Sequence, residues 1–206
     1  MTRWAIFGTG GMGREAADIV RRRHPGDEIA FVTDAGGAPL QGISQIRPDA
    51  IANDDLLVLA IGDCELRRTL RQRFGSRRYG TLVAPSAVVS PSAAIGEGSI
   101  ICEGSLINNG VVIGEHVIVN VLSHISHDCR LGDFVSISPQ VSCNGWVVVE
   151  EGAFIGAGAV IRNGAPDRHL RIGAGAVVGA GAVVLRDVGN DTRAVGVPAR
   201  STRHAS

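Results

Sequence analysis

Residues 113–137 read IGEHVIVNVLSHISHDCRLGDFVSI, and an aliphatic residue occupies every sixth position of this stretch. These positions are Ile113, Val119, Ile125, Leu131 and Ile137. A helix returns an apolar residue to the same face every three or four positions, so a strict period of six does not indicate a helix. The period is typical of a β-helix, in which short strands alternate with turns.

The same spacing extends far beyond this stretch in both directions. Every sixth residue from Val83 to Ile161 is aliphatic or cysteine, and after an interruption at residues 162–171 the spacing resumes in phase at Ile172. Three such units form one triangular coil, and stacked coils bury the aliphatic side chains in a common core. We therefore predict a β-helix of about five coils over residues 81–206, with a C-terminal tail and with a loop at the interruption.

The first 80 residues follow a different pattern. Apolar runs at residues 4–7, 29–32 and 56–61 are predicted to be buried strands, and residues 14–23 and 65–74 are predicted to be helices. Alternation of strand and helix indicates a parallel α/β unit, here about half the size of a complete dinucleotide-binding domain. The predicted fold class is α/β + β, with a small Rossmann-like βαβ domain at residues 1–80 followed by the β-helix at residues 81–206.

Composition excludes several classes of function. The 20 basic residues balance 20 acidic ones, so no positive excess is present to bind a nucleic acid. All basic residues are arginine, which excludes a Schiff-base lysine and a P-loop lysine. No apolar run reaches the length of about 18 residues that a membrane-spanning helix needs. The four cysteines form no C-x-x-C pair, and reduced thiols fit a cytoplasmic protein.

The corners of the repeats carry one polar cluster, formed by Asn120, His124, Ser126, His127 and Asp128. Residue 125 points inward, so His127 and Asp128 fall in the turn that follows. A histidine beside a carboxylate can accept a proton near neutral pH, which makes His127 a candidate general base.

Two alternatives to a catalytic base remain open for the repeat region. His124 and His127, together with His116, could hold zinc in a metal-dependent hydratase, although their spacing gives no obvious shared face. A β-helix can also be an inert scaffold, because a fold alone does not fix a function.

A glycine-rich turn, Gly8-Thr9-Gly10-Gly11-Met12-Gly13, follows the first predicted strand and opens a helix. Asp34 ends the next strand, where an acid can bind a ribose or sugar hydroxyl. An NAD-dependent oxidoreductase is one interpretation, but the second mononucleotide-binding half is missing. We favour binding of a nucleotide-linked small molecule, with its phosphates at the helix N-terminus.

Taken together, these motifs resemble the bacterial sugar acetyltransferases of the NeuD and PglD type over nearly the whole chain. The likeness rests on the glycine-rich turn with Arg14 and Glu15, on residues 60–63 with Arg67, and on residues 125–129 with 131–134. It continues through residues 155–159 and ends with residues 195–200, VGVPAR.

The resemblance implies a left-handed parallel β-helix, a homotrimer, and acetyl-CoA bound between neighbouring prisms, with no metal. His127 would be the general base that activates an amine or hydroxyl of a sugar or nucleotide-sugar, with Asp128 supporting it. The backbone N–H of Gly145 would stabilise the oxyanion. The residues implied to contact acetyl-CoA are Gly145, Ser136, Asn144, Ile155, Gly156 and Gly173. Those implied to bind the acceptor are Gly8, Gly10, Gly11, Met12, Gly13, Asp34, Gly62, Asp63 and His124.

Two features depart from the family pattern. Many relatives have a second histidine where this chain has Ser136, and a serine can donate a hydrogen bond but cannot act as a base near neutral pH. The insertion of about five residues near Pro166 maps to a loop, and we expect it to reshape the CoA site or the acceptor cleft.

Overall fold

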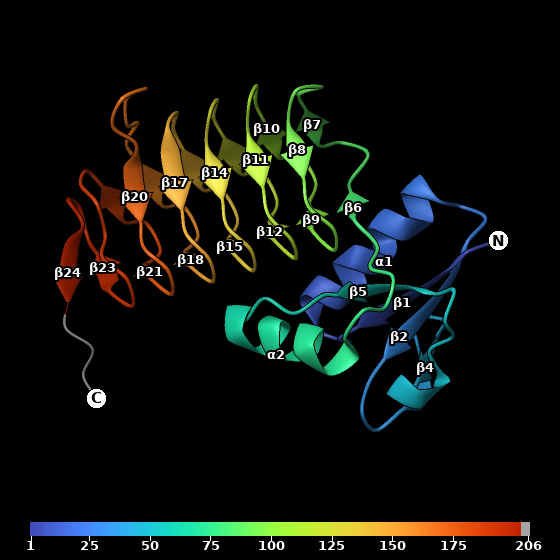
Figure 1. Cartoon of the computed structure of the whole chain (residues 1–206). Coiled ribbons are helices and arrows are strands. Elements are labelled where there is room, and N and C mark those ends of the chain that lie inside the picture. Colours follow the sequence, from blue (N-terminus) through green and yellow to red (C-terminus); the bar gives the residue numbers. More distant parts are fainter. Residues whose placement is uncertain (203–206) are drawn as a thin grey trace.

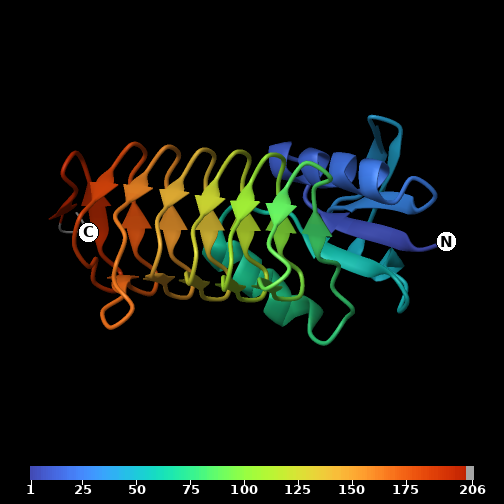
Figure 2. The same ribbon diagram turned by 90° about the horizontal axis from the view of Figure 1, so that it is seen from above.

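A computed structural model describes residues 1–202, and the last four residues of the predicted C-terminal tail, 203–206, lie outside this range. Figure 1 shows an α/β domain at the N-terminal end of a long prism of stacked coils. Figure 2 shows that the coils stack regularly along one axis. Within residues 1–202, neither helix is long and apolar enough to cross a membrane.

The α/β domain is built on a five-stranded sheet in the order β3-β4-β2-β1-β5. Its elements are β1 (Arg3–Phe7), α1 (Gly11–Arg23), β2 (Glu28–Val32), β3 (Gly37–Leu40), β4 (Ile43–Ile46), a 3₁₀ turn η1 (Pro48–Ala50), β5 (Leu56–Leu59) and α2 (Cys64–Phe74). Because β1 pairs in parallel with β2 and β5, the carboxyl ends of these strands meet at one edge. The β3–β4 hairpin was not predicted, since its four-residue strands carry no alternating apolar pattern.

The prism is a left-handed parallel β-helix with three faces. The first face contains β6 (Leu82–Val83), β9 (Ile100–Ile101), β12 (Ile118–Val119), β15 (Ser136–Ile137), β18 (Phe154–Ile155), β21 (Val177–Val178), β23 (Arg193–Val195) and β24 (Arg200–Thr202). The second contains β7 (Val88–Val89), β10 (Leu106–Ile107), β13 (His124–Ile125), β16 (Ser142–Cys143), β19 (Val160–Ile161) and β22 (Val183–Val184). The third contains β8 (Ala94–Ile95), β11 (Val112–Ile113), β14 (Arg130–Leu131), β17 (Val147–Val149) and β20 (Leu170–Ile172).

The six-residue period corresponds to the inward columns of the prism. On the first face, Val119 pairs with Ile137, which in turn pairs with Ile155, and all three side chains are essentially inaccessible to solvent. Each coil stacks on the next at the strand spacing of about 4.8 Å, so one column extends through successive coils. The strands complete five coils, the number that the period suggests, and the interrupted coil closes through β19 and β20. β21 and β22 begin a sixth coil, which reaches the third face only by an isolated bridge between Ile172 and Val188.

The two parts of the chain share a core. Ala16, Ala17 and other apolar residues of α1 pack in one cluster with Leu82, Ile100 and Ile118 of the first face. Figure 1 shows α1 and α2 on the side of the prism formed by this face. The docked domain therefore covers the first face near its N-terminal end, while the other two faces stay uncovered within one chain.

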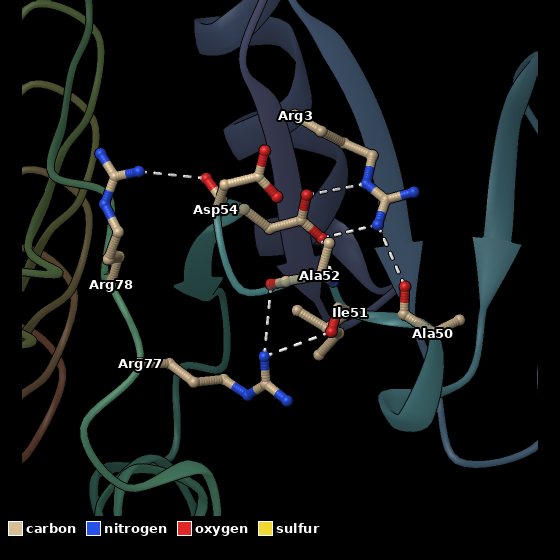
Figure 3. Close-up of polar contacts among 8 residues, drawn as sticks. Arg3, Ala50, Ile51, Ala52, Asp54, Arg77 and Arg78 are labelled. Atoms are coloured by element: carbon tan, nitrogen blue, oxygen red, sulfur yellow. Dashed lines mark hydrogen bonds and ion pairs between the residues drawn. The ribbon is translucent and has the colours of Figure 1, made fainter.

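A network of arginine contacts fixes the segment that leads into β5 (Figure 3). Arg3 donates to both carboxylate oxygens of Asp55, at 3.0 and 2.7 Å, and to the carbonyl of Ala50. Only 4% of the Asp55 side chain is exposed, and its hydrogen bond raises the pKa of Arg3. Arg77 and Arg78 donate to backbone carbonyls of the same segment. These contacts tie the segment before β5 to β1 and to the segment after α2.

Candidate active site

The turns that connect the second face to the third form one edge of the prism, which we name the His127 edge. It comprises residues 126–129, 144–146, 162–169 and 185–187 on successive coils. Backbone bonds stack these turns, since the N–H of Trp146 donates to the carbonyl of His127 and the N–H of Gly164 donates to that of Gly145. Because a three-sided prism has one edge opposite each face, the His127 edge lies opposite the first face and the docked α/β domain.

His127 and Asp128 form the predicted pair on this edge. Nδ1 of His127 lies 2.9 Å from Oδ2 of Asp128. About half of each side chain is exposed, at 43% and 48%. A bond in which Nδ1 donates to the carboxylate leaves Nε2 unprotonated and able to accept a proton.

His127 packs against Gly145, which lies in the corresponding turn of the next coil. A Cβ atom at Gly145 would lie 2.6 Å from Cε1 and 2.7 Å from Nε2 of His127, so only glycine allows this approach. Within residues 1–202, no backbone carbonyl accepts the N–H of Gly145. The amide of Asn144 donates to the carbonyl of Ile161 and so fixes this turn. A backbone donor without a carbonyl partner therefore lies beside the candidate base.

Trp146 was not recognised as a site residue from the sequence. Its indole ring meets the imidazole of His127 edge to face, with the ring centroids 4.5 Å apart. Its position directly after Gly145, at the corner of the coil, was the signal available in the sequence. His124 lies on β13 of the second face, close to the same turn, and its Nε2 is 3.1 Å from the amide nitrogen of Asn108.

The glycine-rich turn lies at the carboxyl edge of the α/β sheet, as predicted from the strand–turn–helix pattern. A Cβ atom at Gly13 would lie 2.0 Å from the carbonyl oxygen of Gly8, so this glycine lets α1 begin directly against the turn. Gly10 and Gly11 face open space, and Gly10 caps α1 without a side-chain hydrogen bond. The helix N-terminus is therefore accessible to an anion. Met12 instead packs against the domain core.

The other predicted acceptor residues lie at the same sheet edge. Asp34 follows β2 and forms an ion pair with Arg73 of α2 at 2.6 Å, which lowers the pKa of the Asp34 carboxyl. Gly62 and Asp63 follow β5, and Asp63 caps α2 by accepting the N–H of Leu66. Both line a cavity of about 730 Å³ between the start of α2 and the first face of the prism.

Ser136 lies away from His127 within one chain, on the first face beneath α2. Its hydroxyl is buried, donates to the carbonyl of Gly62 at 2.7 Å and accepts from Arg67 at 3.0 Å. Arg67 is fully buried and also donates to the carbonyls of Ile61, His116, Phe134 and Val135. In this chain, Ser136 therefore takes part in docking α2 onto the prism.

The remaining residues implied to contact acetyl-CoA also lie away from the His127 edge. The Ile155 side chain points into the prism core with no exposed surface, so only its backbone is near the surface. Gly156 follows β18 and Gly173 follows β20, and these turns form the two other edges of the prism. A single chain therefore brings together four of the predicted residues, His127, Asp128, Asn144 and Gly145. Ile155, Gly156 and Gly173 lie elsewhere.

The three histidines of the zinc alternative do not share a site. His116 is enclosed between Tyr79 and Phe134 under α2, with ring centroids 4.6 and 5.5 Å away. His124 lies on the second face and His127 on the edge beyond it. Among residues 1–202, no three His, Cys, Asp or Glu side chains are grouped so that they could hold a metal ion. The geometry gives no support to a metal-dependent hydratase.

A small Rossmann-like α/β domain followed by a left-handed β-helix is the fold of the PglD- and PerB-type acetyltransferases. Residues 3–74 match the PglD N-terminal domain family. The whole chain is 34% identical to GDP-perosamine N-acetyltransferase of Escherichia coli O157:H7, covering 98% of that protein. The chain belongs to this family of sugar N-acetyltransferases.

Solved structures agree with this assignment. WeeI from Acinetobacter baumannii AYE superposes with a TM-score of 0.91 at 32% identity, over 98% of this chain and all of WeeI. PerB from Caulobacter crescentus, solved with CoA and GDP-perosamine, superposes with a TM-score of 0.85 at 31% identity, over 98% of each chain. The matches favour an acetyltransferase over the NAD-dependent alternative.

Proposed function

We propose that the protein transfers the acetyl group of acetyl-CoA to the amine of a nucleotide-linked amino sugar, with His127 as the general base. The observation that carries the proposal is the imidazole of His127, which is paired with the Asp128 carboxylate and packs beside Gly145 of the next coil. CoA and GDP-perosamine in the PerB structure support the two substrate classes.

The reaction needs no covalent enzyme intermediate. The neutral amine attacks the thioester carbonyl carbon as Nε2 of His127 takes up the amine proton. The N–H of Gly145 donates to the oxyanion that forms. The carbon–sulfur bond then breaks, and the proton on His127 passes to the CoA thiolate. Asp128 holds the imidazole in the required tautomer and stabilises the imidazolium.

The acceptor would bind on the α/β domain. Its diphosphate would lie at the N-terminus of α1, where Gly10 and Gly11 leave the backbone open. Its sugar would extend toward the cavity beside Gly62 and Asp63. Asp34 has a charged carboxylate at the same sheet edge and is placed to accept from a ribose hydroxyl.

The complete site would form between subunits of a homotrimer. In one chain the α/β domain covers the first face, whereas the His127 edge lies opposite that face. The second face also exposes apolar side chains, with Val88 at 62%, Leu106 at 42% and Val160 at 38%, which another prism would cover. The acceptor held by one subunit would then meet His127 of its neighbour. Four free cysteines and an acetyl-CoA donor fit a cytoplasmic enzyme.

A subunit-mixing assay tests this arrangement together with the chemistry. Acetyl transfer from acetyl-CoA to nucleotide-amino sugars would be followed by release of free thiol. His127→Asn should lower kcat by roughly 100-fold or more, and Gly10→Glu should abolish acceptor binding by placing a negative charge at the phosphate site. If the two inactive variants are unfolded and refolded together, mixed trimers should recover part of the activity.

Two results would contradict the proposal. Near-normal turnover by a trimeric His127→Asn variant would show that His127 is not the general base. Mixed trimers that stay inactive, although each variant is folded, would show that the site is not shared between subunits.

A further inference from the structure

The thiol of Cys129 contacts the turn that contains Gly145. Cys129 is the last residue of the His127 turn, and its Sγ donates to the carbonyl oxygen of Asn144 at 3.0 Å. This carbonyl belongs to the same peptide group as the N–H of Gly145. Cys129 has no exposed surface and lies in the core of the prism. The carbonyl of Asn144 therefore points inward, toward the buried thiol.

The direction of this carbonyl fixes the direction of the Gly145 N–H. The peptide bond between Asn144 and Gly145 is trans. In a planar trans peptide group, the C=O and the N–H point in opposite directions. The N–H of Gly145 therefore points away from the core, toward the surface of the edge on which the half-exposed His127 lies.

Backbone hydrogen bonds hold the two flanking peptide groups. The N–H of Asn144 donates to the carbonyl of Ile161 at 3.2 Å, and the carbonyl of Gly145 accepts the N–H of Gly164 at 2.9 Å. The thiol of Cys129 holds the peptide group between them. A hydrogen bond to a carbonyl also polarises its peptide group, which strengthens the N–H as a donor. Both effects prepare the Gly145 N–H to bind a negatively charged oxygen.

This edge of the prism does not need a hydrogen-bond donor at the position of Cys129 in order to fold. The four turns that connect the second face to the third ahead of the insertion begin at residues 90, 108, 126 and 144. Their fourth positions are occupied by Ala93, Val111, Cys129 and Val147. An apolar side chain is therefore sufficient to close the coil, and the donor occurs in the turn directly before that of Gly145.

A serine makes the same bond on a different edge. The hydroxyl of Ser99, at the fourth position of its turn, donates to the carbonyl of Gly114 at 2.9 Å. The two residues are 15 positions apart, as Cys129 and Asn144 are. In the next turn of that edge, Val117 occupies the position of Ser99. Serine and valine both fit this position of the coil, with and without the bond.

We propose that Cys129 is a positioning residue that orients the Asn144–Gly145 peptide group, so that its N–H faces the oxyanion formed during acetyl transfer. The inference rests on the proposed function, which assigns this N–H to the oxyanion. Cys129 is enclosed in the core and acts through the peptide group, without contact to either substrate. Because the oxyanion forms only as the reaction proceeds, the thiol should affect kcat and leave KM nearly unchanged.

Two substitutions of Cys129 separate the hydrogen bond from the shape of the side chain. Cys129→Val removes the donor and introduces the residue found in the turns before and after it, so the coil should still close. Its kcat should fall about 10-fold, part of the roughly 100- to 1000-fold loss that removal of an oxyanion donor causes. KM for acetyl-CoA and for the nucleotide-amino sugar should change less than about twofold. Cys129→Ser keeps a donor and should retain at least about a third of the wild-type kcat.

Ser99→Val is the matched control. It removes the equivalent bond to Gly114 on another edge and should lower the midpoint of urea unfolding at least as much as Cys129→Val, with kcat unchanged. A normal kcat in Cys129→Val would overturn the inference. An equal loss of kcat in Cys129→Ser would also overturn it, and so would an equal loss in Ser99→Val. Failure of the transferase proposal would look different, because His127→Asn would then keep its activity.

Discussion

The imidazole of His127 and the indole of Trp146 meet at an interplanar angle of 87°, with their centroids 4.5 Å apart. The two residues belong to successive coils, and the N–H of Trp146 donates to the carbonyl of His127. An edge-to-face aromatic pair stabilises by about 0.5–1.5 kcal/mol beyond its buried area. Trp146 is therefore a positioning residue for the candidate base.

Replacing Trp146 should lower turnover by loosening His127. Trp146→Leu should reduce kcat by about 3- to 10-fold, which corresponds to losing the interaction free energy of the aromatic pair. Trp146→Phe keeps an aromatic ring and should retain most of the activity. Steady-state kinetics with acetyl-CoA would measure both. A Leu variant with unchanged kcat would mean that the indole does not position the imidazole.

Gly145→Ala should damage activity far more than stability. The new Cβ would lie 2.6 Å from the His127 ring, and an exposed side chain can move away to relieve this contact. Stability should change by less than about 1 kcal/mol, whereas a displacement of the base by about 1 Å can lower kcat by roughly 100-fold. Gly26→Ala is the control, because a Cβ there meets no atom within 4 Å. Normal turnover in the Gly145 variant would contradict the predicted contact.

Ser136→Ala should lower stability and leave the chemical step unchanged. The substitution removes a partner of the buried Arg67 guanidinium and of the Gly62 carbonyl, which should cost about 1–3 kcal/mol. Arg67→Met should cost about 3 kcal/mol or more, since several buried carbonyls lose their donor. Urea unfolding would measure both effects. A fall in kcat at unchanged stability for Ser136→Ala would instead support the acyl contact implied by the resemblance.

Buried His116 should make stability fall at acidic pH. Its pKa is lowered from 6.5 to about 4, first by burial and then by Arg71 and Arg67. Between these values the unfolded chain binds a proton that the folded chain does not. The free energy of unfolding therefore decreases as pH falls below 6.5, by about 2 kcal/mol at pH 5 and up to about 3 kcal/mol near pH 4.

His116→Leu removes this titration and supplies the comparison. Its free energy of unfolding should change less between pH 7 and pH 5 than that of the wild type, whatever its absolute stability. The measurement is urea unfolding at the two pH values. Parallel pH dependences in the two proteins would show that His116 does not titrate in this range on unfolding.

The sequence was sufficient to predict those elements whose pattern depends on residues close together in the chain. A strict period of six predicts stacked short strands, because each inward residue depends only on its position within its own coil. The glycine-rich turn at Gly8–Gly13 could be assigned because Gly13 follows a strand and opens a helix, and the structure confirms this context. The β3–β4 hairpin was missed because its strands are short and half exposed, so they carry no such pattern.

The sequence by itself determined the prism, the α/β domain and the pairing of His127 with Asp128, since these depend on repeats and on residues close in the chain. Only the tertiary structure decided that Ser136 contacts Arg67 and that the domain covers the face opposite His127. Those contacts join residues many positions apart. Their geometry follows from how coils close and how the domain packs on them, which no local pattern specifies.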